Sequence, residues 1–139
     1  MKKIKGTILL LGILILSFQS YGQEKITLQV AINDLRNSTG EILIRVADKN
    51  NKTIDEQKIT IKDGKSIAIF NGLPSGIYVV SYIHDENSNS ALDTGSMGIP
   101  SEGHGFSNDA RGFMGPPDLE AQLFELKTNT VLTLKTKYW

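Results

Sequence analysis

I-Y-V-V-S-Y-I-H, residues 77–84, is the stretch that decides the fold of this chain. Its apolar residues occupy both alternating sets of positions, as in a strand that is covered on both faces. The six residues before it, N-G-L-P-S-G at 71–76, have the composition of a tight corner. Residues 77–84 therefore predict a long central β-strand that begins at this corner and ends at His84.

Six other segments show the period-two alternation of half-buried strands. They lie at residues 26–32, 42–46, 57–62, 65–70, 121–127 and 130–137. Because Asp63-Gly64 is a strong signal for a two-residue turn, we expect the segments on either side of it to form a hairpin. Seven short strands without a helical period predict an all-β fold, a single seven-stranded antiparallel β-sandwich of the immunoglobulin type.

Residues 85–120 break this alternation. They hold six of the 13 glycines and three of the four prolines of the chain. Loops of this length inside compact domains are usually functional or disordered. The segment also holds seven large apolar residues, which are Leu92, Met97, Ile99, Phe106, Phe113, Met114 and Leu119. We therefore expect one long ordered Gly/Pro-rich loop after the central strand, packed on the sandwich by these side chains.

The start of the chain has the pattern of an export signal. Three lysines near the N-terminus precede an apolar run at residues 7–18, and Ser20-Tyr21-Gly22 supplies the small residues of a cleavage site. The apolar run is shorter than the ~20 residues that span a bilayer. We expect residues 1–22 to be a cleaved signal peptide. Residues 23–139 would then be one exported β-sandwich domain, periplasmic or extracellular, without a membrane span.

Composition excludes several classes of function. Removal of the three lysines leaves 12 basic against 15 acidic residues, and this mild acidic balance argues against a nucleic-acid partner. The absence of cysteine excludes disulfides, thiol catalysis and thiolate metal sites. Packing, hydrogen bonds or a bound metal must therefore hold the fold together.

The stretch H-D-E-N-S-N-S-A-L-D, residues 84–93, is the candidate for a metal site. Its oxygen-bearing side chains stand at positions one, three, five and nine of a loop, and they belong to Asp85, Asn87, Asn89 and Asp93. That spacing lets oxygens surround one hard cation, so it predicts calcium as a cofactor. The alternative is a polar loop whose Asp and Asn side chains cap their own backbone, and both interpretations remain open.

Catalysis has weaker support in the sequence. His84 and His104, with Asp85 and Glu102, are the residues that an extracytoplasmic hydrolase-type enzyme would use, and this enzyme is the alternative function. No third histidine, nucleophile elbow or phosphate loop accompanies them. We therefore expect no catalytic residues and favour a non-enzymatic binding or structural module of the cell envelope, whose partner is an envelope protein or a glycan.

Two sets of motifs resemble known families. The run from Tyr82 to Phe124 resembles the signature of a bacterial family catalogued as domain of unknown function 2141. Its features are H-D-E-N at 84–87, G-I-P-S-E-G-H-G-F-S-N at 98–108 and G-P-P at 115–117. That resemblance implies an exported protein with no assigned activity. F-N-G-L-P-S-G-I-Y at 70–78 resembles the corner of prealbumin-like and carboxypeptidase-regulatory modules, which implies the same β-sandwich and no particular function.

The signal peptide should be cut between Gly22 and Gln23, because Ser20 and Gly22 stand at the small-residue positions of a cleavage site. Mass spectrometry of the exported protein should give a chain that begins at Gln23. Protein recovered from the membrane fraction with Met1 still in place would contradict export with cleavage.

Overall fold

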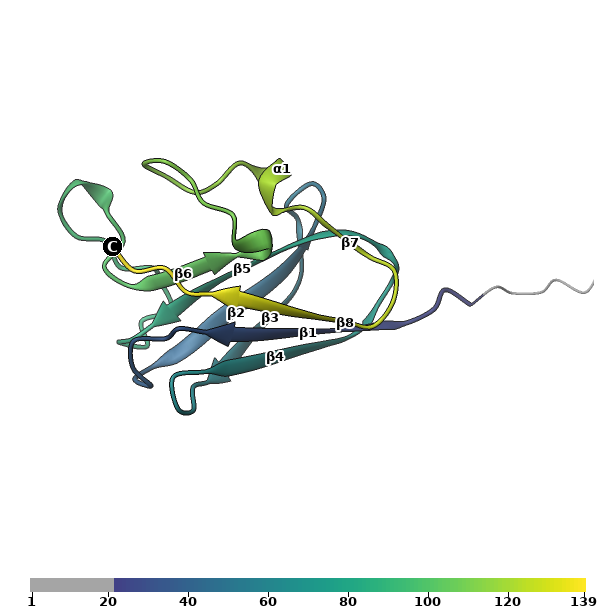
Figure 1. The fold of residues 1–139 in the computed structure, drawn as a ribbon, viewed down its shortest axis with the longest axis horizontal. Helices are drawn as coiled ribbons and strands as arrows, with labels where there is room; N and C mark the ends of the chain where they lie inside the picture. The colour runs from purple at the N-terminus through teal and green to yellow at the C-terminus, as the bar shows by residue number, and fades with distance from the viewer. Residues whose placement is uncertain (1–21) are drawn as a thin grey trace, which may run out of the picture.

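The computed structural model describes residues 22–139, so the predicted signal peptide lies, except for its last residue, outside the described part. Within that part, eight strands, two 3-10 turns and one short helix follow one another (Figure 1). The strands are β1 (Ile26–Asn33), β2 (Glu41–Asp48), β3 (Thr53–Thr60), β4 (Ser66–Leu73), β5 (Gly76–Asp85), β6 (Gly103–Phe106), β7 (Phe124–Leu126) and β8 (Thr130–Lys135). The helical elements are η1 (Ser96–Gly98), η2 (Ser107–Asp109) and α1 (Leu119–Gln122).

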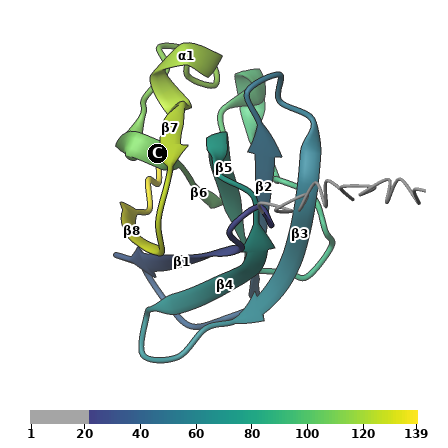
Figure 2. The same cartoon turned by 90° about the vertical axis from the view of Figure 1, so that its right-hand side faces the viewer.

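The strands form two sheets (Figure 2). The smaller sheet has three strands in the order β4-β1-β8, and the larger has five, β3-β2-β5-β6 with β7 paired to the start of β5. β8 runs parallel to β1, because the chain reaches it from β7 in the other sheet and not through a hairpin. The all-β prediction is confirmed, whereas the predicted seven strands and uniformly antiparallel pairing are wrong.

The two sheets enclose one hydrophobic core. Every second residue of β1 is buried, as alternation predicts, and these residues are Ile26, Leu28, Val30 and Ile32. Burying an aliphatic side chain of this size contributes about 1.5–3 kcal/mol. β5 is the central strand of the larger sheet, paired with β2 along one edge and with β6 and β7 along the other. The prediction of a central strand at residues 77–84 is therefore confirmed.

The predicted hairpin around Asp63-Gly64 is wrong, although its turn forms. Lys62 and Lys65 exchange two backbone hydrogen bonds of 2.9 and 3.0 Å. Asp63 and Gly64 adopt the positive φ angles, 51° and 68°, that such a turn requires. The chain then changes sheets, because β3 joins the larger sheet and β4 the smaller one. Turn chemistry is local, whereas sheet membership depends on the partner strands available elsewhere in the fold.

The predicted strand at residues 121–127 is also shorter than expected. α1 takes its first part, and only Phe124–Leu126 forms strand β7. The Gln122 side chain is buried and donates a hydrogen bond of 2.9 Å to the carbonyl of Pro117. This bond holds the chain in a helical turn where the alternation of the sequence favours a strand.

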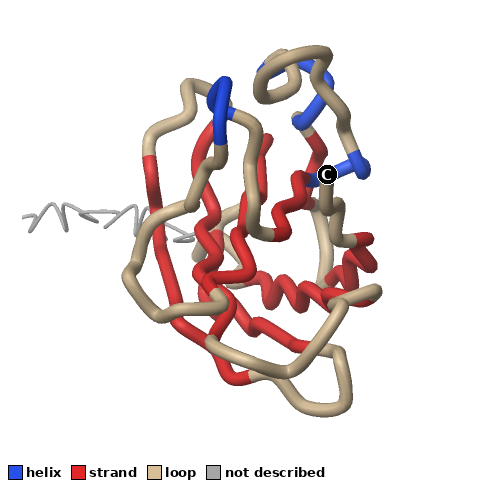
Figure 3. The backbone as a smooth tube through the Cα atoms, turned by 90° about the vertical axis from the view of Figure 1, so that its left-hand side faces the viewer, coloured by secondary structure: helices blue, strands red, loops and turns tan. Residues whose placement is uncertain are grey.

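The long segment at residues 85–120 contains β6 and the helical turns, joined by irregular chain (Figure 3). The expectation that its apolar side chains pack it on the sandwich is wrong for most of them. Met97, Phe113 and Met114 are 91%, 94% and 84% exposed, and Leu92 and Ile99 are also exposed. The pairing of β6 with β5 and the buried polar side chains of Glu102 and Ser107 hold the segment instead.

Gly105→Ala should lower the free energy of unfolding by about 1–3 kcal/mol through overpacking. A Cβ at this position would meet the Tyr82 ring at 2.4 Å, and Tyr82 is buried with its hydroxyl 3.1 Å from Thr136 Oγ1. Gly115→Ala is the matched control, because a Cβ there meets nothing within 4 Å. Urea unfolding measures both variants, and equal stability of Gly105→Ala and the wild type would contradict this packing.

Candidate functional site

The outer face of the larger sheet carries a groove of about 530 Å³ that crosses β3, β2, β5 and β6. A row of outward side chains that are neighbours in register forms its floor, and they are Lys58, Leu43, Ile83 and His104. Phe106 follows on β6, with its ring centroid 6.1 Å from that of His104. Because successive strand residues point to opposite faces, these positions are free of the core and available to a ligand.

Arg45 gives the groove a fixed positive charge. Its guanidinium donates to Ser81 Oγ at 2.9 Å, to Thr53 Oγ1 at 3.2 Å and to Asn51 Oδ1 at 2.7 Å. All three acceptors are neutral, so the guanidinium is held in place while its charge stays uncompensated by them. Such a side chain orients a ligand without a large loss of its own rotamer freedom.

The loop at residues 86–93 forms one wall of the groove. Ser90 and Leu92 line the hollow together with the strand residues. Lys58 Nζ donates to Ser90 Oγ at 2.8 Å and lies 3.4 Å from a carboxylate oxygen of Glu41. This contact joins the loop to β3.

Glu102 holds both ends of this loop. Its Oε1 accepts the backbone N–H of Glu86 at 2.8 Å, and its Oε2 accepts that of Asp93 at 3.0 Å. The side chain is buried, so both bonds form away from water. A buried carboxylate that accepts two backbone N–H groups is a structural anchor.

The four predicted metal ligands have different partners. Asp85 is fully buried, and its two oxygens accept the backbone N–H groups of Asn89, at 3.1 Å, and Ser90, at 2.7 Å. The side-chain amides of Asn87 and Asn89 both donate to the Asp93 carboxylate. Asn89 N–H is shared by Asp85 Oδ1 and Asn87 Oδ1, so these two oxygens lie on one side of the loop.

The structure therefore brings Asn87, Asn89 and Asp93 together and directs Asp85 to the backbone. These contacts are the ones that the capping interpretation expects. Within residues 22–139, no three Asp, Glu or His side chains gather as a metal site. A cation here would depend on amide oxygens as much as on carboxylates.

His84 is fully buried and ties three parts of the chain together. Its Nε2 lies 2.7 Å from the carbonyl oxygen of Thr39, which only accepts, so Nε2 carries the proton. Its Nδ1 then accepts from the hydroxyl of Tyr138 at 2.7 Å. The Tyr138 oxygen accepts in turn from the Arg36 backbone N–H at 3.2 Å. Both ring nitrogens are therefore occupied by structural bonds.

Arg36 and Glu86 form a two-point ion pair beside this histidine, with N–O distances of 2.6 and 3.0 Å. The Arg36 guanidinium also lies 4.6 Å from the centre of the Tyr138 ring. The hydrogen bond from Arg36 lowers the pKa of Glu86 below its usual value. Sequence reasoning missed this pair because its members lie far apart in the chain, and no spacing rule connects them.

The four residues of the enzyme alternative do not form one site. His84 pairs in register with Gly103 and His104 pairs with Ile83, so the two histidine side chains point to opposite faces of the sheet. Asp85 and Glu102 use their oxygens on backbone N–H groups, as described above. Burial lowers the pKa of His104, and among the described side chains its Nδ1 is the buried polar atom without a hydrogen-bond partner.

The groove was missed from the sequence as well. Leu43, Arg45, Ser81 and Ile83 stand at the outward positions of strands, where a mixture of apolar and charged residues is typical of ordinary surface. One signal was available, because residues 77–84 are apolar on both faces of the strand. Only one of these faces covers the core, so the other must carry apolar residues that lie outside the core, such as Ile83. Sequence reasoning attributed that character to a covering layer and not to a binding surface.

Glu102→Gln should loosen the loop at residues 86–93, because an NH₂ group would replace one acceptor oxygen and face a backbone N–H. The expected loss of stability is about 1–3 kcal/mol. Hydrogen exchange should show faster exchange of the Glu86 and Asp93 amides. Glu120→Gln, on the exposed surface, is the control. Unchanged exchange in Glu102→Gln would contradict the anchoring role.

Comparison with known proteins gives one family. The family described as "Uncharacterized protein conserved in bacteria (DUF2141)" matches residues 30–133, which is most of the chain and includes both sheets. No curated protein and no solved structure matches the chain. Among the described residues, no helix has the length and apolar character needed to cross a membrane.

Proposed function

This chain belongs to the DUF2141 family of uncharacterised bacterial proteins, and we propose that it is an exported, non-enzymatic binding module of the cell envelope. The groove on the outer face of the larger sheet carries this proposal. It is the place where apolar floor residues and oriented polar groups meet, as in ligand sites generally. Export rests on the N-terminal pattern of lysines, apolar run and cleavage site.

The ligand that best fits the groove is a segment of an envelope protein. Leu43 and Ile83 give the floor an aliphatic character that suits apolar side chains, whereas a glycan, which is rich in hydroxyls, needs more polar partners. Arg45 and Lys58 add positive charge, and Glu56 on β3 adds a negative charge. β3 is the edge strand of the larger sheet and runs beside the groove, which suits an extended polypeptide.

The enzyme alternative has no comparable support. An acid–base site needs groups that converge in one hollow with free lone pairs or protons. His84, Asp85 and Glu102 are each engaged in buried hydrogen bonds, and His104 lies across the sheet from His84. His104 instead adds a polar atom to the floor of the groove.

A screen of peptides and envelope glycans tests the groove, with the chain beginning at Gln23. Peptides that mix apolar and charged residues should bind wild-type protein and raise its melting temperature, by mass action. Ile83→Lys should abolish that response, because it places a charge on the apolar floor. Ile69→Lys, on the exposed face of the smaller sheet, should leave it intact. Glycan binding that survives Ile83→Lys, with no peptide response, would reject the proposal.

We also propose that calcium binds the loop at residues 85–93. The support is the convergence of Asp85 Oδ1 and Asn87 Oδ1 on one backbone N–H, 3.1 and 3.2 Å away. A carbonyl-type oxygen that accepts one hydrogen bond keeps a second lone pair for a cation. Asp93, which now accepts from the Asn89 amide at 2.9 Å, and the side-chain oxygen of Asn89 would complete the set that holds the ion.

Calcium should raise the melting temperature of the chain that begins at Gln23, and a chelator should lower it. A dissociation constant of about 10⁻⁴ M, as in extracellular modules, gives about 1.8 kcal/mol of stabilisation near 2 mM free calcium. Asp93→Asn should remove this response, whereas Glu125→Gln on β7 should keep it. Identical melting curves of the wild type in calcium and in chelator would contradict calcium binding. The Asp and Asn side chains of the loop would then serve only to cap its backbone.

A further inference from the structure

Among the described residues, the most exposed large apolar side chains sit at the tips of two loops. Met97 in η1 is 91% exposed, and Phe113 and Met114, between η2 and α1, are 94% and 84% exposed. Isolated exposed apolar residues are common, but three large ones that are almost wholly exposed call for a partner that covers them. The groove does not explain them, because none of the three lines it.

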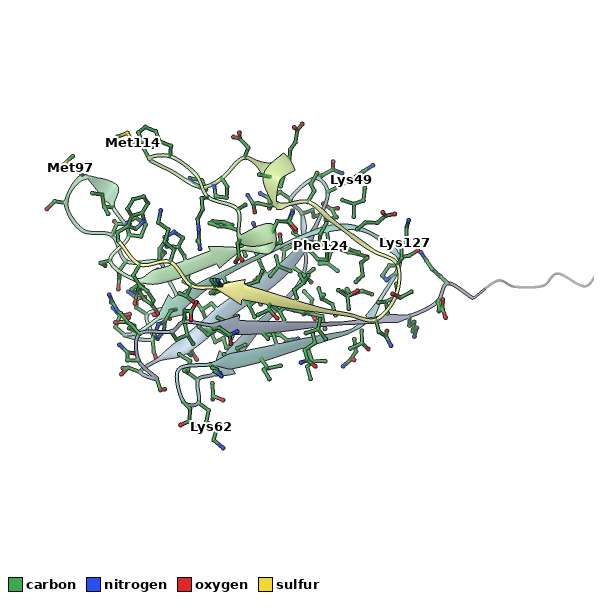
Figure 4. All side chains as sticks on the ribbon, viewed as in Figure 1. Lys49, Lys62, Met97, Met114, Phe124 and Lys127 are labelled. Atoms are coloured by element: carbon green, nitrogen blue, oxygen red, sulfur yellow. The ribbon has the colours of Figure 1, made fainter. Side chains whose placement is uncertain are left out.

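The two tips project from the same side of the molecule. In Figure 4, Met97 and Met114 both point outward beyond the sheets, on the side where η1 and the loop before α1 rise. Figures 2 and 3 show the same two loops at the same end of the molecule. The C-terminus joins this end, since Trp139 lines the same small hollow as Arg111 and Gly115. We call this end the loop-tip surface. It consists of Met97, Phe113, Met114 and Trp139, together with the cations Arg111 and Lys137 beside Trp139.

The backbone presents two of these side chains at a conformational cost. Met97 and Met114 have φ angles of 64° and 56°, in the left-handed region that long L side chains rarely adopt. Glycine or asparagine would relieve that strain, and neither stands at these positions. Residues with such backbone conformations are concentrated at functional sites. In this protein the two strained residues are methionines whose side chains are exposed to solvent.

Positive charge accompanies the apolar tips. Arg111 and Lys137 line the hollow beside Trp139, and the Lys137 ammonium lies 3.4 Å from the centre of the Trp139 ring. Acids flank this loop without belonging to its tip: Asp109 in η2 accepts the backbone N–H of Lys135 at 2.9 Å, and Asp118 and Glu120 stand at the start of α1. Apolar tips, an amphipathic indole and two cations together have the composition of a surface that meets anionic lipid.

We propose that the loop-tip surface inserts shallowly into an anionic phospholipid bilayer. The shape favours lipid over a protein partner. Protein interfaces place their apolar anchors in a continuous patch that a complementary surface packs around. Separate convex tips offer no such patch, whereas a fluid bilayer accepts protruding side chains individually. Phe113 and the two methionines would enter the acyl boundary, while Arg111 and Lys137 stay among the phosphates.

Trp139 is the only tryptophan of the chain, so its fluorescence reports directly on this surface. The test uses the chain that begins at Gln23, which keeps every element described here, because the first strand starts at Ile26. Vesicles of phosphatidylethanolamine with about a third phosphatidylglycerol provide the anionic surface. Wild-type protein should sediment with these vesicles, and its tryptophan emission should shift to shorter wavelength.

Variants separate insertion from general adhesion. Met97→Ser, Phe113→Ser and Met114→Ser combined should lower the vesicle partition coefficient about tenfold or more, because the apolar contribution is lost. Arg111→Gln with Lys137→Gln should also lower it, by about 25-fold, since each cation near an anionic surface contributes about a fivefold factor. Ile67→Ser, Ile69→Ser and Val131→Ser combined remove three exposed apolar residues from the smaller sheet and should leave the partition unchanged.

Three results would overturn the proposal. They are no sedimentation of the wild type with vesicles, equal partition of the tip variant and the wild type, and an emission shift that depends on protein concentration without lipid. The last result would assign the loop-tip surface to contact between copies of the chain. None of the residues substituted in this test lies on the floor of the groove. A failure of the protein to bind vesicles can therefore be distinguished from a failure of the groove to bind a peptide.

Discussion

Strand β5 is the constraint on which the rest of the structure depends. It is paired along both edges, so it cannot move without breaking contacts with β2, β6 and β7. Because its side chains alternate, Tyr82 and His84 are buried on the core side, while Ser81 and Ile83 line the groove. A shift of one residue in register would exchange the two sets and expose the core, so the position of the groove follows from the requirement to bury the core.

The long segment after β5 is stable for a different reason. Buried polar groups hold it at a few points: Glu102 at the loop ends, and Ser107, whose hydroxyl accepts from the Val80 N–H and donates to the carbonyl of Gln122. A hydrogen bond that involves a charged group contributes about 1.5–3 kcal/mol. These anchors act together with the pairing of β6 to β5, so most of the large apolar side chains of the segment are left out of the packing. This explains how Met97 and Phe113 remain in solvent within an ordered fold.

Alternation predicted the strands well because burial of one face is a local property of sequence. It failed where the fold depends on distant partners. Asp63-Gly64 forms the expected turn, yet the choice of sheet for β3 and β4 depends on β2 and β1. The polar loop poses a different question, because carboxylate oxygens satisfy backbone N–H groups and cations equally well. Spacing alone therefore identified Asp85 as chemically special without telling which partner it has, and the fold directs it to two N–H groups.

The motifs that carry the family resemblance now have physical roles, and nearly all of them are structural. In H-D-E-N, His84 binds the Thr39 carbonyl, Asp85 caps the loop and Glu86 pairs with Arg36. In the next motif, Glu102 anchors the loop, and Gly105 leaves room for the Tyr82 ring. The groove floor at Leu43 and Ile83 and the loop tips lie outside these motifs, and only His104 and Phe106 belong to both a motif and the groove. The three motifs therefore account for parts of the scaffold of this chain. Its function has to be sought in the residues between the motifs, where neither the core nor the anchors dictate the side chain.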